Sequence, residues 1–506
     1  MSTATSYARL GHLVLKKETT AGTPVYPDTF LELLSEDIVV NWDHTPSNAI
    51  AGNRSMNMTA IKNRIEPIEG TIEMLIEPTG FGHIMTGLFG AATDTTLDSG
   101  VSEQHDFEPQ NTLQTYTMDV KMAGEGYVTR YFGVRIASVQ FSIDENKIKA
   151  SIGIMAQKAF TNARVDTAAS SGTALVLDQT SGLTTSDTIQ VLDADDPSTT
   201  IAEYTISSIT DENNMVVSTI SDTLAVDDIV VIKAQTPSYS QANEFIWSGG
   251  AQASIANGAH GIQNLSAYTN LEEFSLTVTN DLEARWAATG NDVIDRFPAN
   301  ILVKSVAVEG SISKFHQDPE FLDMLRENEQ TTLRIEFLGD ALAANSAVAA
   351  TANVETDGSD QLAVAIDSAG EAGNDYAIIF TTGNGSLTAS LSGKLITVNL
   401  DATTGNNTTT LVAAAIDGLS GVSCPTTGSD IVTTADNSSK IHFSGGRDAN
   451  EVEMLRIDLP NVRLKPFNAN LGNDDVIQEE IDFTAYRDEN DGREVEMRLR
   501  NATASY

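Results

Sequence analysis

Residues 68–72 read Ile-Glu-Gly-Thr-Ile, and residues 308–312, 240 positions later, read Val-Glu-Gly-Ser-Ile. The same offset aligns residues 31–38 (LELLSEDI) with residues 271–278 (LEEFSLTV) without a gap. It also aligns a set of apolar residues, which are Phe81, Ile84 and Met85 with Phe321, Met324 and Leu325. Three blocks that keep one register over about 55 residues indicate that the chain carries two copies of one unit.

Each copy shows the pattern of a β-rich unit. We expect a first strand over residues 31–41 or 271–280, then a polar loop or long hairpin arm, then a second strand over residues 65–76 or 301–315. In the second strand of the first copy, two faces alternate. The apolar face holds Ile68, Gly70, Ile72, Met74 and Ile76, and the polar face holds Glu69, Thr71, Glu73 and Glu77.

A short helix follows this strand in both copies. In the first copy it starts after Glu77-Pro78-Thr79-Gly80 and carries Phe81, Ile84, Met85 and Leu88 at helical spacing; Pro319, Phe321, Leu322 and Leu325 repeat the pattern. The closing strands are expected over residues 134–143 and 147–154, and over residues 455–464, 476–486 and 493–499. We expect the last two to form a hairpin around residues 488–492. The predicted fold is mainly β, a duplicated β-sandwich or half-open barrel with a packed short helix in each copy.

Two segments differ in composition from these copies. Residues 165–240 hold one basic residue, Lys233, and residues 341–446 hold only Lys394 and Lys440. The first segment has short apolar β runs that suggest a small barrel. The second has strands around residues 376–381 and 395–400 and a helix over residues 408–419, which suggests an α+β module. It enters where the first copy has only the hairpin tip at residues 121–126, and such tips tolerate insertion.

The expected organisation therefore has five parts. They are residues 1–160 (first copy), 161–242 (inserted β module), 243–340 (first part of the second copy), 341–448 (inserted α+β module) and 449–506 (second part of the second copy).

Composition excludes several classes of protein. The formal net charge of -40 excludes a general nucleic-acid binder, which needs clustered Lys and Arg. The single cysteine, Cys424, cannot form an intrachain disulfide. The N-terminal residues are polar without the features of a signal peptide, and no apolar run approaches the ~18 residues that span a bilayer. We expect a soluble protein that is made in a cytoplasm.

The sequence predicts no catalytic, cofactor or metal site. The seven histidines form no zinc motif with a Glu, and there is no nucleophile elbow or phosphate loop. Asp193, Asp195 and Asp196 lack the glycine and the distal glutamate of a calcium loop, so we interpret them as a solvated turn.

Several motifs resemble the tail tube proteins (major tail proteins) of long-tailed bacteriophages. Residues 13–25 (LVLKKETTAGTPV) are similar to the start of that family, residues 274–283 and 308–312 to its second half, and residues 455–462 (LRIDLPNV) to its last hairpin. The motifs also occur in the family's order. The resemblance leaves out both inserted modules, which look like the decorations that project from virions.

The resemblance implies a structural, non-enzymatic subunit. Family members join their inner strands into a continuous barrel and stack as rings by a long arm; single-copy members form six-membered rings, so a duplicated chain can close the same ring with three chains. The implied partners are further copies of the chain, the tape measure, tail terminator and distal tail proteins, and DNA that passes through without specific binding. The implied location is the virion tail, after assembly in the host cytoplasm.

The polar face of the second strand is the candidate functional site. We expect Glu69, Thr71 and Glu73, with Glu309 at the equivalent position, to face the channel, where negative charge keeps DNA from adhering. The alternative is an ordinary solvent-facing strand. The repeat is not strict, because Ser313 stands where the first copy has Glu73.

Other functions also remain open at this point. A β-modular surface adhesin or glycan-binding virion protein would explain the acidic modules, but it predicts a secretion signal and exposed aromatic clusters. A glycosidase would need paired carboxylates in an aromatic cleft, and the chain has three Trp residues. A ring of six chains is the alternative to a ring of three.

Overall fold

The computed structural model describes most of the chain, and the protein is mainly β, as predicted. The described residues are 10–40, 65–98, 100–122, 124–240, 242–258, 260–268, 271–287, 297–315, 320–327, 330–344, 346–383, 385–466 and 478–506. The arm expected after residue 41 in the first copy, and Pro319, lie outside these ranges. None of the helices in the described ranges is long and apolar enough to cross a membrane.

The first half of the fold comprises β1 to β10 and α1. Its elements are β1 (His12–Lys17), β2 (Thr29–Leu31), β3 (Ser35–Glu36), β4 (Ile68–Leu75), α1 (Phe81–Phe89), β5 (Ala92–Asp98), β6 (Ser102–Phe107), β7 (Tyr116–Lys121), β8 (Tyr127–Asp144), β9 (Lys147–Ala156) and β10 (Lys158–Phe160). One sheet has the order β3-β4-β9-β8. A second sheet has the order β2-β1-β7-β8-β10. The long strand β8 belongs to both, and α1 is buried between them against β8 and β6.

The second half comprises β17 to β21, α2 and β29 to β31. Its elements are β17 (Ala251–Asn257), β18 (Ser266–Tyr268), β19 (Leu271–Arg285), β20 (Asn300–Phe315), α2 (Glu320–Glu327), β21 (Thr331–Ala344), β29 (Asn450–Leu464), β30 (Gln478–Ala485) and β31 (Glu496–Asn501). One sheet has the order β19-β20-β30-β29 and the other β18-β17-β21-β29-β31. Strand for strand, this is the pairing order of the first half.

The two halves also share register. The quoted pentapeptides lie in β4 and β20, where Ile72 pairs with Ile152 of β9 and Ile312 pairs with Ile481 of β30. The β7–β8 ladder shifts register after Tyr116, and the β21–β29 ladder shifts register after Thr331, its counterpart in the second half. Bulges are specific local features, so a shared bulge is a stronger correspondence than a shared strand order.

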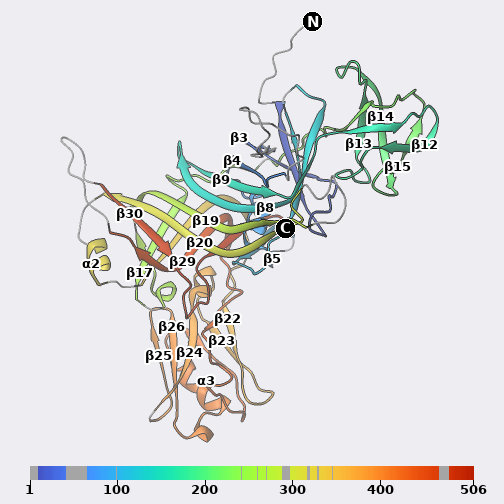
Figure 1. The fold of residues 1–506 in the computed structure, drawn as a ribbon. Helices are drawn as coiled ribbons and strands as arrows, with labels where there is room; N and C mark the ends of the chain where they lie inside the picture. The colour runs from blue at the N-terminus through green and yellow to red at the C-terminus, as the bar shows by residue number, and fades with distance from the viewer. Residues whose placement is uncertain are drawn as a thin grey trace, which may run out of the picture.

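The halves are joined edge to edge within one chain. Residues 138–141 of β8 pair antiparallel with residues 276–279 of β19. A continuous eight-stranded sheet results, in the order β3-β4-β9-β8-β19-β20-β30-β29, which curves through the middle of Figure 1. One hydrophobic cluster runs from Leu13 to Leu499 and includes buried residues of both halves. We call this sheet the central sheet.

A second contact between the halves has no counterpart among the described residues. The β5–β6 hairpin of the first half pairs through β6 with β31 of the second half. The C-terminal Tyr506 packs its ring against His83 of α1 and His105 of β6, and its hydroxyl donates to the carbonyl of Thr79 at 2.7 Å. In the second half, α2 is followed directly by β21, so no equivalent hairpin lies between them.

We call the two joined halves the frame. Two modules with their own hydrophobic clusters project from it (Figure 1). The first module is an antiparallel set of strands, β11 (Ala163–Thr167), β12 (Gly172–Leu177), β13 (Thr188–Leu192), β14 (Thr200–Ile209), β15 (Asn214–Ile220) and β16 (Ile229–Lys233). The second module lies between β21 and β29 and contains β22 (Thr351–Val354), β23 (Leu362–Ile366), β24 (Ala377–Thr382), β25 (Thr388–Ser392), β26 (Leu395–Leu400), α3 (Thr409–Asp417), β27 (Val422–Ser423) and β28 (Ile441–His442). The hydroxyl of Thr408 caps α3 by accepting from the backbone N–H of Leu411.

Several local predictions differ from the structure. The strand expected over residues 31–41 is shorter, with β3 covering only Ser35–Glu36 and a single bridge at Val39. The hairpin expected around residues 488–492 is wrong: β30 and β31 both pair with β29, at different ends of it, and not with each other. The strands expected over residues 134–143 and 147–154 are joined by a tight two-residue turn, in which Glu145 and Asn146 both have positive φ.

Candidate functional site

The central sheet has one face against the hydrophobic core and one polar face. In β4, Ile68, Ile72 and Met74 are buried in the core, and the alternate residues point away from it. Glu69 is exposed, while Thr71 and Glu73 are half-buried. Glu69, Thr71 and Glu73 therefore share the polar face, as predicted for the strand. Glu77, which the alternation also placed on this face, does not, because its carboxylate turns to the start of α1 and accepts from the backbone N–H groups of Thr79 and Gly80.

Glu309 occupies the corresponding place in the second half. It is exposed on β20, opposite Thr277 of β19 and Thr484 of β30. The ammonium of Lys465 lies 3.1 Å from its carboxylate, and the Thr484 hydroxyl donates to it at 3.3 Å. The hydrogen bond and the positive charge of Lys465 lower the pKa of Glu309.

Glu73 is also paired. The ammonium of Lys149 in β9 lies 3.0 Å from its carboxylate, and the hydroxyl of Ser35 donates to it at 3.0 Å. These hydrogen bonds, the one from Lys149 first, lower the pKa of Glu73. The polar face therefore carries both signs of charge at two of the four predicted positions.

Uncharged side chains, most of them small, fill part of the remaining polar face. From β9 across to β30 they are Ser151, Gly153, Ser138, Gln140, Ser142, Thr277, Ser275, Ser311 and Thr484. Three exposed carboxylates, those of Glu273, Glu480 and Asp482, share this face, because they lie opposite Ser313 and Ser311 of β20. The hydroxyls of Ser275 and Ser311 lie 2.9 Å apart across the β19–β20 ladder. Sequence reasoning missed Lys149 and Lys465 as partners. Alternation within β9 could have placed Lys149 on the polar face, but nothing in the sequence indicates which carboxylate it meets.

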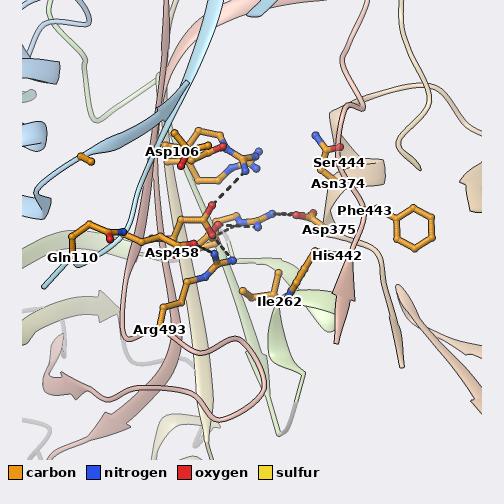
Figure 2. A pocket seen from close by; sticks show the side chains of 17 residues that line it. Asp106, Gln110, Ile262, Asn374, Asp375, His442, Phe443, Ser444, Asp458 and Arg493 are labelled. Carbon is orange, nitrogen blue, oxygen red and sulfur yellow. Dashed lines mark hydrogen bonds and ion pairs between the residues drawn. The ribbon is translucent and has the colours of Figure 1, made fainter. Parts of the chain in front are cut away.

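A second polar site lies where the second module meets the frame. A cavity of about 330 Å³ there is lined by residues of β6, β21, β29 and β31 and by residues of the second module. Figure 2 shows the side chains that line it. Its guanidinium groups face carboxylates: Arg334 meets Asp458 at 2.5 Å and Asp375 at 2.8 Å, and Arg498 meets Asp106 at 2.5 Å. The charges are close to balanced, so the cavity is suited to holding the module in place.

Glu371 of the second module is the centre of the adjoining ion-pair network. Its carboxylate lies 2.8 Å from Arg456 and 3.5 Å from Arg498, and it also pairs with Arg500. Burial alone would raise the pKa of Glu371, but Arg456, Arg500 and Arg498 together lower it to about 2. The second module is therefore attached by buried charge as well as by its two chain connections.

The first module is attached to the frame by a similar buried ion-pair network. Arg130 of β8 is fully buried and makes two hydrogen bonds to Asp119 of β7, at 2.6 and 2.8 Å. It makes two more to Asp187 of the first module, at 2.6 and 2.9 Å. Bidentate pairs of this kind fix orientation as well as distance.

Within the described ranges, no three His, Cys, Asp or Glu side chains are placed to hold a metal ion. Asp196, in the acidic turn of the first module, accepts hydrogen bonds from Ser198 and Thr199. The carboxylate of Asp196 is therefore hydrogen-bonded within its own turn.

Comparison with known proteins identifies the first part of the chain. No curated protein matches the sequence. A family model does match, that of the phage tail tube protein, over residues 8–238. The match runs through the first module and ends before the second half. The resemblance noted in the sequence is therefore confirmed for residues 8–238, which match the model of the phage tail tube protein family.

Proposed function

We propose that this chain is the structural subunit of a phage tail tube, that it arose by duplication of a tube unit, and that three chains close each ring. Rings stack head to tail, and the polar face of the central sheet lines the channel for DNA. The role is mechanical and not catalytic. The family match over residues 8–238 supports the tube; the ring and the channel rest on the arguments below.

The pairing of β8 with β19 is the observation that carries the proposal. It joins two sheets of equivalent strand order side by side, as neighbouring units in a ring must be joined. The counterpart of β19 in the first half is β3, whose outer edge has no strand beside it among the described residues. The counterpart of β8 is β29, and the counterpart of the paired residues 138–141 follows Leu464 in the chain. Repeating the β8–β19 contact between chains therefore joins the end of β29 to β3 of the next chain.

The dimensions favour three chains. Eight strands per chain make 24 in a ring of three, and strands spaced by about 4.8 Å and tilted by about 40° then give a backbone diameter of about 48 Å. A ring of six would double this to about 96 Å by the same spacing. The smaller bore clears a B-DNA duplex with side chains in place, whereas the larger one would leave most of the channel empty.

In this ring Glu69, Thr71, Glu73 and Glu309 face the channel. Glu73 and Glu309 are paired with lysines, so the wall is polar and of mixed sign with a negative excess. DNA binds proteins mainly by releasing counterions to clustered cations, and isolated lysines already held by carboxylates offer little of this. Such a wall lets the duplex slide.

Both modules project outward as decorations and the chain is a virion tail component, assembled in the host cytoplasm. Its partners are further copies of itself, the tape measure, tail terminator and distal tail proteins, and the passing DNA.

Native mass spectrometry and electron microscopy of the purified chain test the proposal. The expected result is a ring of three chains with pseudo-sixfold symmetry, stacked into tubes. Rings of six chains would refute the stoichiometry, and a protein that remains monomeric at high concentration would refute the tube.

A further inference from the structure

An arginine–aspartate pair lies across the same two strands in both halves, with its charges exchanged. In the first half Asp119 of β7 lies opposite Arg130 of β8, and in the second half Arg334 of β21 lies opposite Asp458 of β29. In both ladders this is the second residue pair after the shared bulge, so the register fixes the correspondence. The acid and the base have changed places between the two copies, but the pair itself is kept.

In each pair the arginine also binds an aspartate of a module. Arg130 lies 2.6 Å from Asp187 of the first module, and Arg334 lies 2.8 Å from Asp375 of the second module. In both halves an arginine is therefore held between one aspartate of the frame and one of a module, and none of the six side chains is more than 12% exposed. We call these groups the first seat (Asp119, Arg130 and Asp187) and the second seat (Arg334, Asp375 and Asp458).

Both seats lie on the side of the frame away from the central sheet. The residues that flank each seat along β7 and β21 point into the hydrophobic core; they are Met118, Val120, Leu333 and Ile335. Because neighbouring residues of a strand point to opposite faces, the seats point away from this core. The polar face of the central sheet lies on the other side of the same core. In the proposed ring the seats therefore open outward.

The modules reach their seats by different chain connections. The first module follows β10 and returns through β16, whereas the second is inserted between β21 and β29. Residues 232 and 233 of β16 pair with residues 127 and 128 of β8, and the N–H of Ala234 donates to the carbonyl of Gly126 at 2.9 Å. The base of the first module thus lies beside the tip of the β7–β8 hairpin, and the second module replaces the tip of the equivalent β21–β29 hairpin. Both modules stand over the same end of equivalent strand pairs.

We infer that the two seats are equivalent docking sites, so that in the proposed ring the two kinds of module alternate in a single belt of six at one height along the tube. The inference rests on the proposed ring, in which the rotation that relates the two halves is repeated around the axis. What each half offers is a buried guanidinium on its outer side, and what each module brings is an aspartate at its base. Figure 1 shows the two modules leaving the frame in different directions, as a rotation about the tube axis requires.

Electron microscopy of assembled tubes tests the belt. Each ring of the wild-type chain should show six outward densities at one height, spaced by a sixth of a turn, with two shapes that alternate. Replacing residues 341–446 by a Gly-Ser linker should remove every second density and leave three at the same height. Densities at two different heights would overturn the inference and leave the tube itself intact.

Hydrogen–deuterium exchange of the purified full-length chain tests the seats without the ring. Asp187→Asn should speed the exchange of backbone amides in residues 180–190 about tenfold, because it leaves a buried arginine with one aspartate fewer. Asp375→Asn should do the same for residues 370–378, and neither change should affect the base of the other module. The matched controls, which should leave exchange unchanged, replace an exposed acid of each module; they are Asp166→Asn and Asp367→Asn.

The outcomes separate this inference from the function on which it rests. An unchanged exchange rate at the base of a module, in the variant that lacks its aspartate, would show that the arginine does not hold that module and would overturn the inference. If the wild-type chain forms no rings, the proposed function and the belt are both wrong, whereas the exchange rates still decide whether the two seats hold the modules.

Discussion

Replacing Glu371 by Gln should loosen the second module from the frame. The change keeps the size of the side chain and removes the negative charge that Arg456, Arg498 and Arg500 surround. The folded-state pKa of about 2 lies roughly 2.5 units below the ordinary value of 4.5, and each unit corresponds to about 1.4 kcal/mol. The carboxylate thus contributes about 3 kcal/mol, in the range found when one partner of a buried ion pair is removed.

The sign of the pH dependence follows from the lowered pKa. The carboxylate stabilises the folded protein fully above its unfolded pKa of about 4.5, and this contribution is lost as the pH falls towards 2. Glu371→Gln lacks the contribution at every pH. The difference in stability between wild type and variant should therefore be largest at neutral pH and shrink between pH 4.5 and 2.

Differential scanning calorimetry at neutral pH provides the measurement. For a cooperative unit of 150–250 residues, about 3 kcal/mol lowers the midpoint of unfolding by about 6–12 °C. The control is Asp367→Asn, an exposed acid of the same module, which should leave the midpoint unchanged. If both variants melt alike, or if their difference from wild type does not depend on pH, the network does not fix the module as described.

Three further changes probe other parts of the molecule. Changing Glu69 and Glu73 to Lys should leave tubes intact but slow DNA ejection; normal ejection would count against the channel mechanism, and a structure with both carboxylates on the outer wall would refute the placement. Replacing residues 341–446 by a Gly-Ser linker should still give tubes in electron micrographs, although with a lower melting midpoint because Glu371 and its neighbours are lost; a truncated chain that cannot polymerise would make the module part of the core. Arg130→Met should lower the free energy of unfolding by about 3–5 kcal/mol, because it leaves two aspartates buried without their cation, and a loss below about 1 kcal/mol in urea titration would contradict this.

The alternation of apolar and polar residues predicted the faces of β4, and helical spacing predicted α1. Both are local patterns, in which neighbours along the chain decide the result. The offset of 240 pointed to the same correspondence that appears in the pairing of Ile72 and Ile312 with their partner strands.

Long-range pairing was not predictable in the same way. The turn at residues 488–492 looks like a hairpin locally, but β29 is long enough to pair with β30 at one end and with β31 at the other, so the two strands that flank the turn never meet. The partners of Glu73 and Glu309 could not be predicted either, because Lys149 and Lys465 come close to them only through the order of strands in the sheet. The ion-pair network around Glu371 joins three distant segments, and no local pattern marks them.

The pairing of β8 with β19 inside one chain also bears on how quickly and at what concentration the proposed ring can assemble. Six separate units would have to meet in solution, and the amount of complete ring would rise with the sixth power of their concentration. Here three of the six joints are made when the chain folds, at an effective concentration set by the intervening residues and not by the cell. Ring formation then follows the third power of the chain concentration, so tubes can begin to grow while the protein is still scarce.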